Sequence, residues 1–155
     1  VKLFERFGIF TKAELESRAE VLYETYAKTI NIEALTMVDM ASKQIIPAVI
    51  TYATELAASI NEVTSALPDA DVSVQTELLT ETQALLSDTK VALAKLTDVQ
   101  AKGAAMPDGK EQAEYYRDVV KTAMDELRAP VDKLEMIVDK EIWPLPSYGD
   151  LMFEV

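Results

Sequence analysis

Apolar residues recur every three or four positions over most of this chain, which is the spacing of one buried helix face. The first such stripe predicts a long helix beginning at the sequence TKAE, where Thr11 and Glu14 have the spacing of a capping box. The stripe crosses Pro47 in phase, so we expect one helix of about 55 residues with a proline bend rather than two helices. Its members are Leu15, Ala19, Leu22, Tyr26, Ile30, Ala34, Met37, Ala41, Ile45, Val49, Tyr52, Leu56, Ile60 and Val63.

Two further helices are predicted after short loops. SALPDADVS forms the first loop, and residues 72–102 form a second helix whose leucines recur seven residues apart. GAAMPDG forms the second loop, where Asp108 and Glu111 have the cap-to-third-residue spacing. The third helix is expected to stop at Pro144, and Pro130 should bend or break it. Its inward stripe is Tyr116, Val120, Ala123, Leu127, Val131, Leu134 and Val138.

No alternating strand pattern of any length is present, so the fold class is predicted to be all-α. Short loops between long helices indicate antiparallel neighbours, which gives an antiparallel bundle of three long helices with an extended C-terminal tail. The first helix is longer than its partners. Part of it must therefore project beyond them, pack against the tail, or pack against other protein. The expected core includes Leu56, Ile60, Leu85, Leu93, Val120 and Leu127.

Length and charge narrow the class of protein. A chain of 155 residues suits one domain with a real core. Lys and Arg total 15 against 27 Asp and Glu, and the net charge of −12 disfavours nucleic acid and anionic membrane as partners. No apolar run approaches the roughly 20 residues that span a bilayer.

Candidate chemistry is sparse. The chain has no cysteine and no histidine, so it lacks a thiolate nucleophile, the commonest general base and the commonest transition-metal ligand. It has no glycine-rich phosphate loop. Carboxylate pairs such as Glu16 with Glu20 and Glu77 with Glu81 are interpreted as solvated helix faces, because di-iron bundles need histidine beside glutamate. The sequence therefore predicts no catalytic, cofactor-binding or metal-binding residue.

Two stretches carry more apolar surface than a three-helix bundle covers. TINIEALTMVDM, residues 29–40, is apolar nearly all round, and the tail EIWPLPSYGDLMFEV is apolar where a terminus is usually polar. Either the tail folds back onto the first helix near residues 30–40, or both stretches dock on other protein. The candidate interface residues are Ile32, Leu35, Met40, Trp143, Tyr148 and Phe153.

These same stretches carry a family resemblance. ELESR (residues 14–18), KTINIEALTMVDMA (28–41) and WPLPSYGDLMFEV (143–155) resemble the C-terminal region of type III glutamine synthetases. The resemblance runs from about residue 3 to the end, while residues 60–112 add little to it. It implies that residues 1–155 are a single helical C-terminal domain, a fragment of a much longer chain, as a start at Val1 rather than methionine also suggests.

The resemblance also implies a function for the parent protein. Such a parent ligates ammonia to glutamate with ATP and magnesium or manganese, through residues of an upstream catalytic core. We therefore expect a cytoplasmic, ring-shaped oligomer in which this domain packs on the core or between subunits and carries none of the catalytic residues.

Two other functions stay open at this point. One is a stand-alone helical bundle that binds a protein partner. The other is an autonomous enzyme, which the missing histidine, cysteine and glycine-rich loops disfavour. The reading frame upstream of Val1 separates the stand-alone bundle from a domain of a glutamine synthetase.

Overall fold

A computed structural model describes residues 2–146 and 148–153, with Lys2 and Tyr148 described by their backbone alone. All regular secondary structure in these ranges is helical, which confirms the predicted all-α class. The elements are α1 (Lys2–Arg6), α2 (Lys12–Met40), the π-helical turn η1 (Ala41–Ile45), α3 (Ile46–Ala66), α4 (Ser73–Ala104), α5 (Lys110–Tyr115), the π-helical turn η2 (Tyr116–Val120), α6 (Lys121–Glu135) and α7 (Tyr148–Phe153).

The first long helix begins at the predicted capping box. Thr11 Oγ1 accepts a hydrogen bond from the Glu14 backbone N–H (3.2 Å), and Glu14 Oε2 accepts one from the Thr11 backbone N–H (2.7 Å). From Lys12 onward, α2, η1 and α3 follow one another without a loop to Ala66. Pro47 is the second residue of α3, which begins directly after η1, so helical structure continues across the proline.

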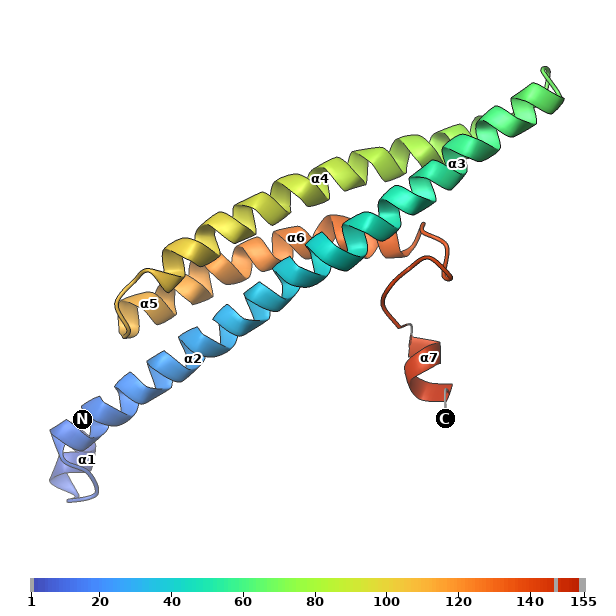
Figure 1. Ribbon diagram of the computed structural model, residues 1–155. Helices are drawn as coiled ribbons and strands as arrows, with labels where there is room; N and C mark the ends of the chain where they lie inside the picture. Colours follow the sequence, from blue (N-terminus) through green and yellow to red (C-terminus); the bar gives the residue numbers. More distant parts are fainter. Residues whose placement is uncertain (1, 147, 154–155) are drawn as a thin grey trace.

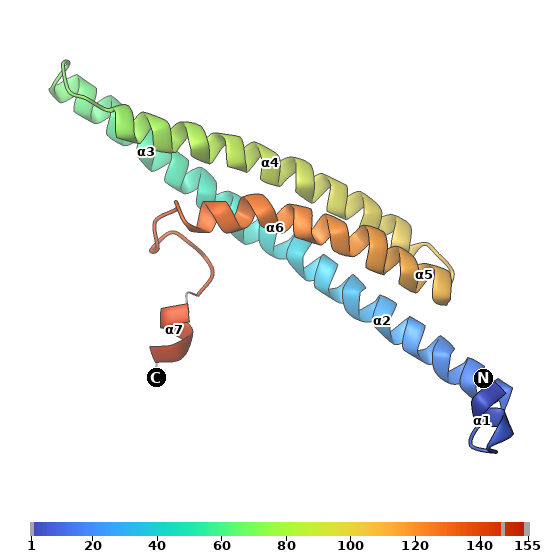
Figure 2. The ribbon, with the colours of Figure 1, turned by 180° about the vertical axis from the view of Figure 1, so that it is seen from behind.

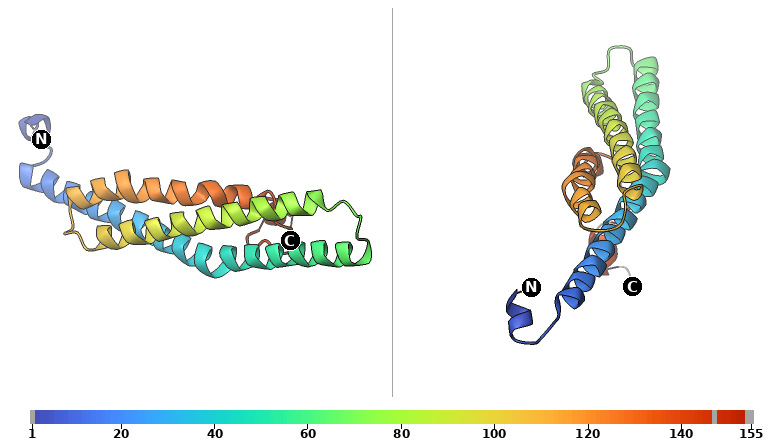
Figure 3. Two further views of the ribbon diagram at one scale, coloured as in Figure 1. Left: turned by 90° about the horizontal axis from the view of Figure 1, so that it is seen from above. Right: turned by 90° about the vertical axis from the view of Figure 1, so that its left-hand side faces the viewer.

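The three long helical segments lie side by side. Figures 1 and 2 show α4 turning back along α3, and α5, η2 and α6 returning along α4. The beginning of α2 extends past α5 and carries α1 at its tip, so part of the first helix does project beyond its neighbours (Figure 1). Figure 3 shows this projection from two further sides. After α6 the chain leaves the other helices, and α7 lies apart from them (Figures 1 and 2).

The core consists of two neighbouring clusters. The larger joins α2, α4, η2 and α6 around Ala34, Leu96, Tyr116, Val120 and Leu127, each 1% exposed or less. The smaller lies around η1 and α3 and consists of Ile45, Val49, Leu85, Leu134 and Val138.

Four of the expected core residues are confirmed as buried, and two are not. Leu85, Leu93, Val120 and Leu127 are buried. Leu56 and Ile60 are only half-buried, because the end of α3 extends past α6 and keeps α4 as its neighbour there (Figure 1).

Two helix ends differ from the prediction. Asp108 is not the cap of α5; Gly109 holds that position at φ 136°, where glycine is favoured, and no side chain caps the helix. The third helix ends at Glu135 rather than at Pro144. Just after α6, the backbone N–H groups of Met136 and Ile137 bond to the carbonyls of Lys133 and Leu134, three residues earlier. Further on, the Asp139 carboxylate accepts a hydrogen bond from the Glu141 backbone N–H (2.7 Å). Pro130 lies inside α6 and does not break it.

Candidate interaction surfaces

A polar junction fixes which face of α2 turns inward. Asn31 Oδ1 accepts hydrogen bonds from Gln100 Nε2 of α4 (2.7 Å) and from the Tyr116 hydroxyl of η2 (2.9 Å). Three elements therefore meet at one side chain, and the next residue, Ile32, is turned away from them. Polar bonds of this kind specify one arrangement because a misplaced partner leaves a donor unsatisfied.

The junction needs space around Tyr116. Gly103 lies against its ring, and a Cβ at this position would come within 3.2 Å of ring atoms. Burial raises the pKa of the Tyr116 hydroxyl, which therefore stays a neutral hydrogen-bond donor.

The first turns of the inward stripe were predicted wrongly. Leu22 is 69% exposed and Tyr26 is 37% exposed, whereas Ala27 is 2% exposed and begins the buried face. Ala27 lies one helical turn before Asn31, on the side of α2 where Asn31 bonds to Gln100 and Tyr116.

The opposite side of α2, continued into η1, carries what we call the outer stripe. It consists of seven exposed residues at alternating steps of four and three: Val21, Thr25, Lys28, Ile32, Leu35, Asp39 and, in η1, Ser42. Ile32 is 64% exposed and Leu35 is 48% exposed. Two large apolar side chains one helical turn apart are thus exposed together, and contiguous exposed apolar surface often marks an interaction site. Thr25 and Thr36 donate their hydroxyl hydrogens to their own helix, to the carbonyls of Val21 and Ile32. These donors are thus already satisfied, which lowers the cost of covering this surface.

The proximal part of the tail packs on the fold. Trp143 is half-buried against the smaller core cluster, and its indole Nε1 is buried without a hydrogen-bond partner. Leu145 lines, together with Met37 and Met40, a groove of about 410 Å³ between the first helix and α6. Met40, a candidate interface residue, is half-buried at this groove.

The distal part of the tail does not fold back onto the first helix, which was one of the two alternatives. Phe153 is 79% exposed and Leu151 68%, so Phe153 does not lie on the first helix. The chain turns outward after Glu135, which carries α7 away from α2 (Figure 1). Lys140 Nζ donates to Asp150 Oδ1 (2.9 Å) and links α7 to the turn after α6. The side chain of Tyr148 lies outside the described residues.

The N-terminal tip is an apolar surface that the sequence analysis missed. Phe7 is 67% exposed and Leu3 is 64% exposed on and just after α1. The guanidinium of Arg18 lies 4.7 Å from the centre of the Phe10 ring, which fixes the tip to α2. The apolar spacing of Leu3 and Phe7, one helical turn apart, was the available signal.

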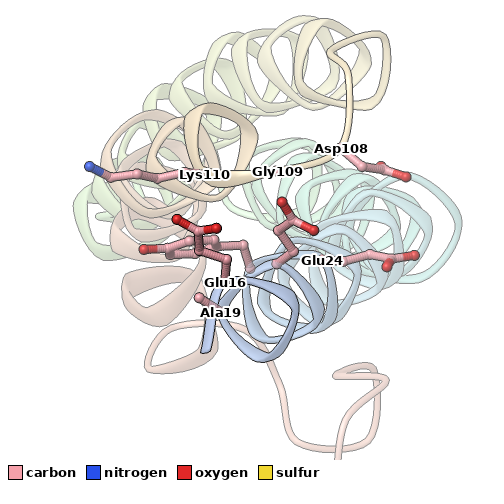
Figure 4. A pocket seen from close by; sticks show the side chains of 8 residues that line it. Glu16, Ala19, Glu24, Asp108, Gly109 and Lys110 are labelled. Atoms are coloured by element: carbon pink, nitrogen blue, oxygen red, sulfur yellow. The ribbon is translucent and has the colours of Figure 1, made fainter. Parts of the chain in front are cut away.

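A second cavity is acidic. Glu16, Glu20 and Glu24 of α2 face Asp108 and Lys110 across a cavity of about 470 Å³. In Figure 4, Lys110 and Asp108 extend to opposite sides of it. Across the described part of the chain, no three or more acidic side chains are grouped so as to hold a metal ion. Nor does any helix described there have the length and apolar character to cross a membrane.

Comparison with known proteins finds relatives of this sequence. Residues 1–64, which include α1, α2, η1 and most of α3, match the glutamine synthetase C-terminal domain. A glutamine synthetase of Butyrivibrio fibrisolvens is 34% identical over the whole chain. The chain is therefore similar to part of a glutamine synthetase, and its first 64 residues match the C-terminal domain family of these proteins.

Two further glutamine synthetases show the same relation. One from Bacteroides fragilis is 30% identical over 94% of the chain, and a type-3 glutamine synthetase of Dictyostelium discoideum is 29% identical over 99% of it. The chain spans only 20–22% of the length of these relatives. It corresponds to one part of a glutamine synthetase, and the predicted resemblance is confirmed.

Proposed function

We propose that this chain is the non-catalytic helical C-terminal domain of a longer glutamine synthetase and serves packing or subunit assembly. One observation carries the proposal: a chain with the length of one fifth of its relatives exposes large apolar side chains that its own core leaves uncovered. Exposed apolar surface of this kind typically marks a protein–protein contact.

The parent would ligate ammonia to glutamate with ATP and magnesium or manganese, through residues upstream of this domain. The absence of histidine and cysteine from the sequence supports a non-catalytic role, since the usual general base and nucleophile are missing. The partners would be the catalytic core of the parent and neighbouring subunits of a cytoplasmic oligomer.

Residues 1–155 would act as one antiparallel three-helix bundle, with the first helix bent near Pro47. Helices α2 and α3 follow one another without a loop, and the π-helical turn η1 lies between them, shortly before the proline. A π-helical turn next to a proline supports a bend there. The interface would use Ile32 and Leu35 of the outer stripe, together with Met40, Trp143, Tyr148 and Phe153 of the first helix and tail.

The reading frame upstream of Val1 tests this function. We expect a long continuous frame that encodes a glutamine synthetase catalytic region. A start codon directly before Val1 would contradict the proposal and favour a stand-alone protein-interaction module.

The purified chain gives a second test. It should form no glutamine and show no saturable binding in a calorimetric titration with Mg-ATP, because no phosphate-binding loop is present in its sequence. Saturable binding in the micromolar range would assign a nucleotide site to this domain and contradict the non-catalytic role.

A further inference from the structure

We propose that the outer stripe of α2 pairs with the same stripe of a second copy of this chain, in an antiparallel two-fold contact centred between Glu33 and Ala34. The proposal rests on the assembly role inferred above and names the partner of that surface. Its basis is a self-complementary order of side chains along the stripe.

The order can be followed outward from the centre. In an isologous contact, the residue at one distance before the centre faces the residue at the same distance after it in the partner. Ile32 then faces Leu35, Lys28 faces Asp39, and Thr25 faces Ser42. Apolar thus meets apolar, positive meets negative, and small polar meets small polar.

The spacing of the stripe fits the same contact. From Thr25 to Ser42 the exposed positions follow steps of three, four, three, four and three residues, which is the seam of a two-stranded coiled coil. This series reads the same from either end, as an antiparallel pair of identical helices requires. Beyond Ser42 the seam stops, because Ile46 packs on the core of its own chain.

The polar groups of the stripe can accept such a contact. Thr25 and Ser42 already donate their hydroxyls to carbonyls of their own helix, so covering them leaves no hydroxyl donor unpaired. Lys28 and Asp39 form ion pairs with Glu24 and Lys43 on the exposed surface, and such pairs exchange partners at little cost.

The contact is expected to be weak by itself. One pair of helices covers less than the roughly 1,200–2,000 Å² of a stable stand-alone interface. The net charge of −12 on each chain also opposes pairing, although salt at physiological strength screens charges beyond about 8 Å. Within an oligomer held together by other contacts, this pairing would fix the register and orientation of the two α2 helices.

Disulfide trapping tests the register, because the chain has no cysteine of its own. Thr25→Cys and Ser42→Cys are prepared as separate variants, mixed and oxidised at physiological salt. Facing positions should yield at least about tenfold more linked dimer in the mixture than in either variant alone. Two copies of Thr25 lie 17 residues apart in this register, about 25 Å along the axis, too far for a disulfide.

A matched control uses another exposed threonine that also bonds its own helix. Thr54→Cys on α3 is mixed with Thr25→Cys and should yield no more dimer than background. Dimer formed by Thr25→Cys alone would indicate a parallel contact and overturn the proposal. Equal yields in all mixtures, or none in any, would do the same.

Charge reversal tests the pairing of Lys28 with Asp39. Lys28→Glu in both cysteine variants places two acids opposite each other and should lower the dimer yield, and adding Asp39→Lys should restore it. A dimer yield that stays the same in both variants would contradict the pairing of Lys28 with Asp39. The reading frame upstream of Val1 decides the assembly role separately, so failure of trapping removes this contact alone.

Discussion

The two faces of α2 differ in burial: other helices of the chain cover the inner face and leave the outer face exposed. The inner face buries Ala27, Ile30 and Ala34 against α4, η2 and α6 and adds the polar junction at Asn31. The outer face carries Ile32 and Leu35 within the same stretch of helix and leaves both exposed. Apolar composition alone therefore does not identify the core of this helix, since both faces carry apolar residues and only one of them is covered by α4, η2 and α6.

The largest expected loss of stability follows from changing a core residue that packs with the inner face of α2. Leu127→Ala should lower the free energy of unfolding by about 2–5 kcal/mol, because Leu127 is 1% exposed within close-packed neighbours. Urea unfolding followed by circular dichroism measures it. Val91→Ala on α4, which is 69% exposed, is the control and should stay near the wild type. A loss below about 1 kcal/mol at Leu127 would contradict the packing of α6 described here.

The next effect concerns the junction that orients α2. Asn31→Ala removes the acceptor of Gln100 and Tyr116 and should cost about 1–3 kcal/mol, since two donors lose their partner. Asn61→Ala, an exposed asparagine of α3, is the matched control in the same urea titration. Equal stability of the two variants would show that the junction does not fix the rotation of α2.

The C-terminal tail shows the same difference in burial, since its beginning packs on the smaller core cluster and its end is exposed. Trp143→Ala should cost about 1–2 kcal/mol, because its ring is half-buried on the smaller core cluster. Phe153→Ala should leave the melting temperature unchanged, as the ring is 79% exposed. A thermal melt of both variants decides between these roles. A large loss at Phe153 would mean that α7 packs on the fold.

The smallest effect is expected at the projecting start of α2. Thr11→Ala should speed hydrogen exchange in the first turn without shifting the global melt, because this end lies beyond the core (Figure 1). The hydrogen bond from the Thr11 backbone lowers the pKa of Glu14 below 4.5. Its stabilising effect is therefore present at neutral pH and lost as pH falls through that lowered value. Exchange that does not change in the variant, or with acid, would argue against a functional cap.

Local patterns in the sequence predicted the helices better than their ends. The capping box at Thr11, the all-α class and the burial of Leu93 and Val120 follow from spacing, which is a local property. The end of α6 at Glu135 was missed because the prediction relied on Pro144, whereas the backbone N–H groups of Met136 and Ile137 already turn to carbonyls three residues earlier.

The surfaces were predictable in composition but only partly in placement. The exposure of Ile32 and Leu35 agrees with their position outside the apolar stripe. Ala27 rather than Tyr26 is buried on the side of α2 where Asn31 meets partners 69 and 85 residues away in sequence, and no local spacing reveals such contacts. The path of the tail likewise depends on the turn after α6 and could not be derived from its apolar content.

We infer that the outer face of α2 serves a partner and not the fold of this chain. The decisive measurement is the free energy of unfolding of the double variant Ile32→Ser, Leu35→Ser, at a protein concentration low enough to exclude association. The value should lie within about 0.5 kcal/mol of the wild type, as for exposed positions without special contacts. A loss of more than about 2 kcal/mol would show instead that both side chains belong to the core of this chain.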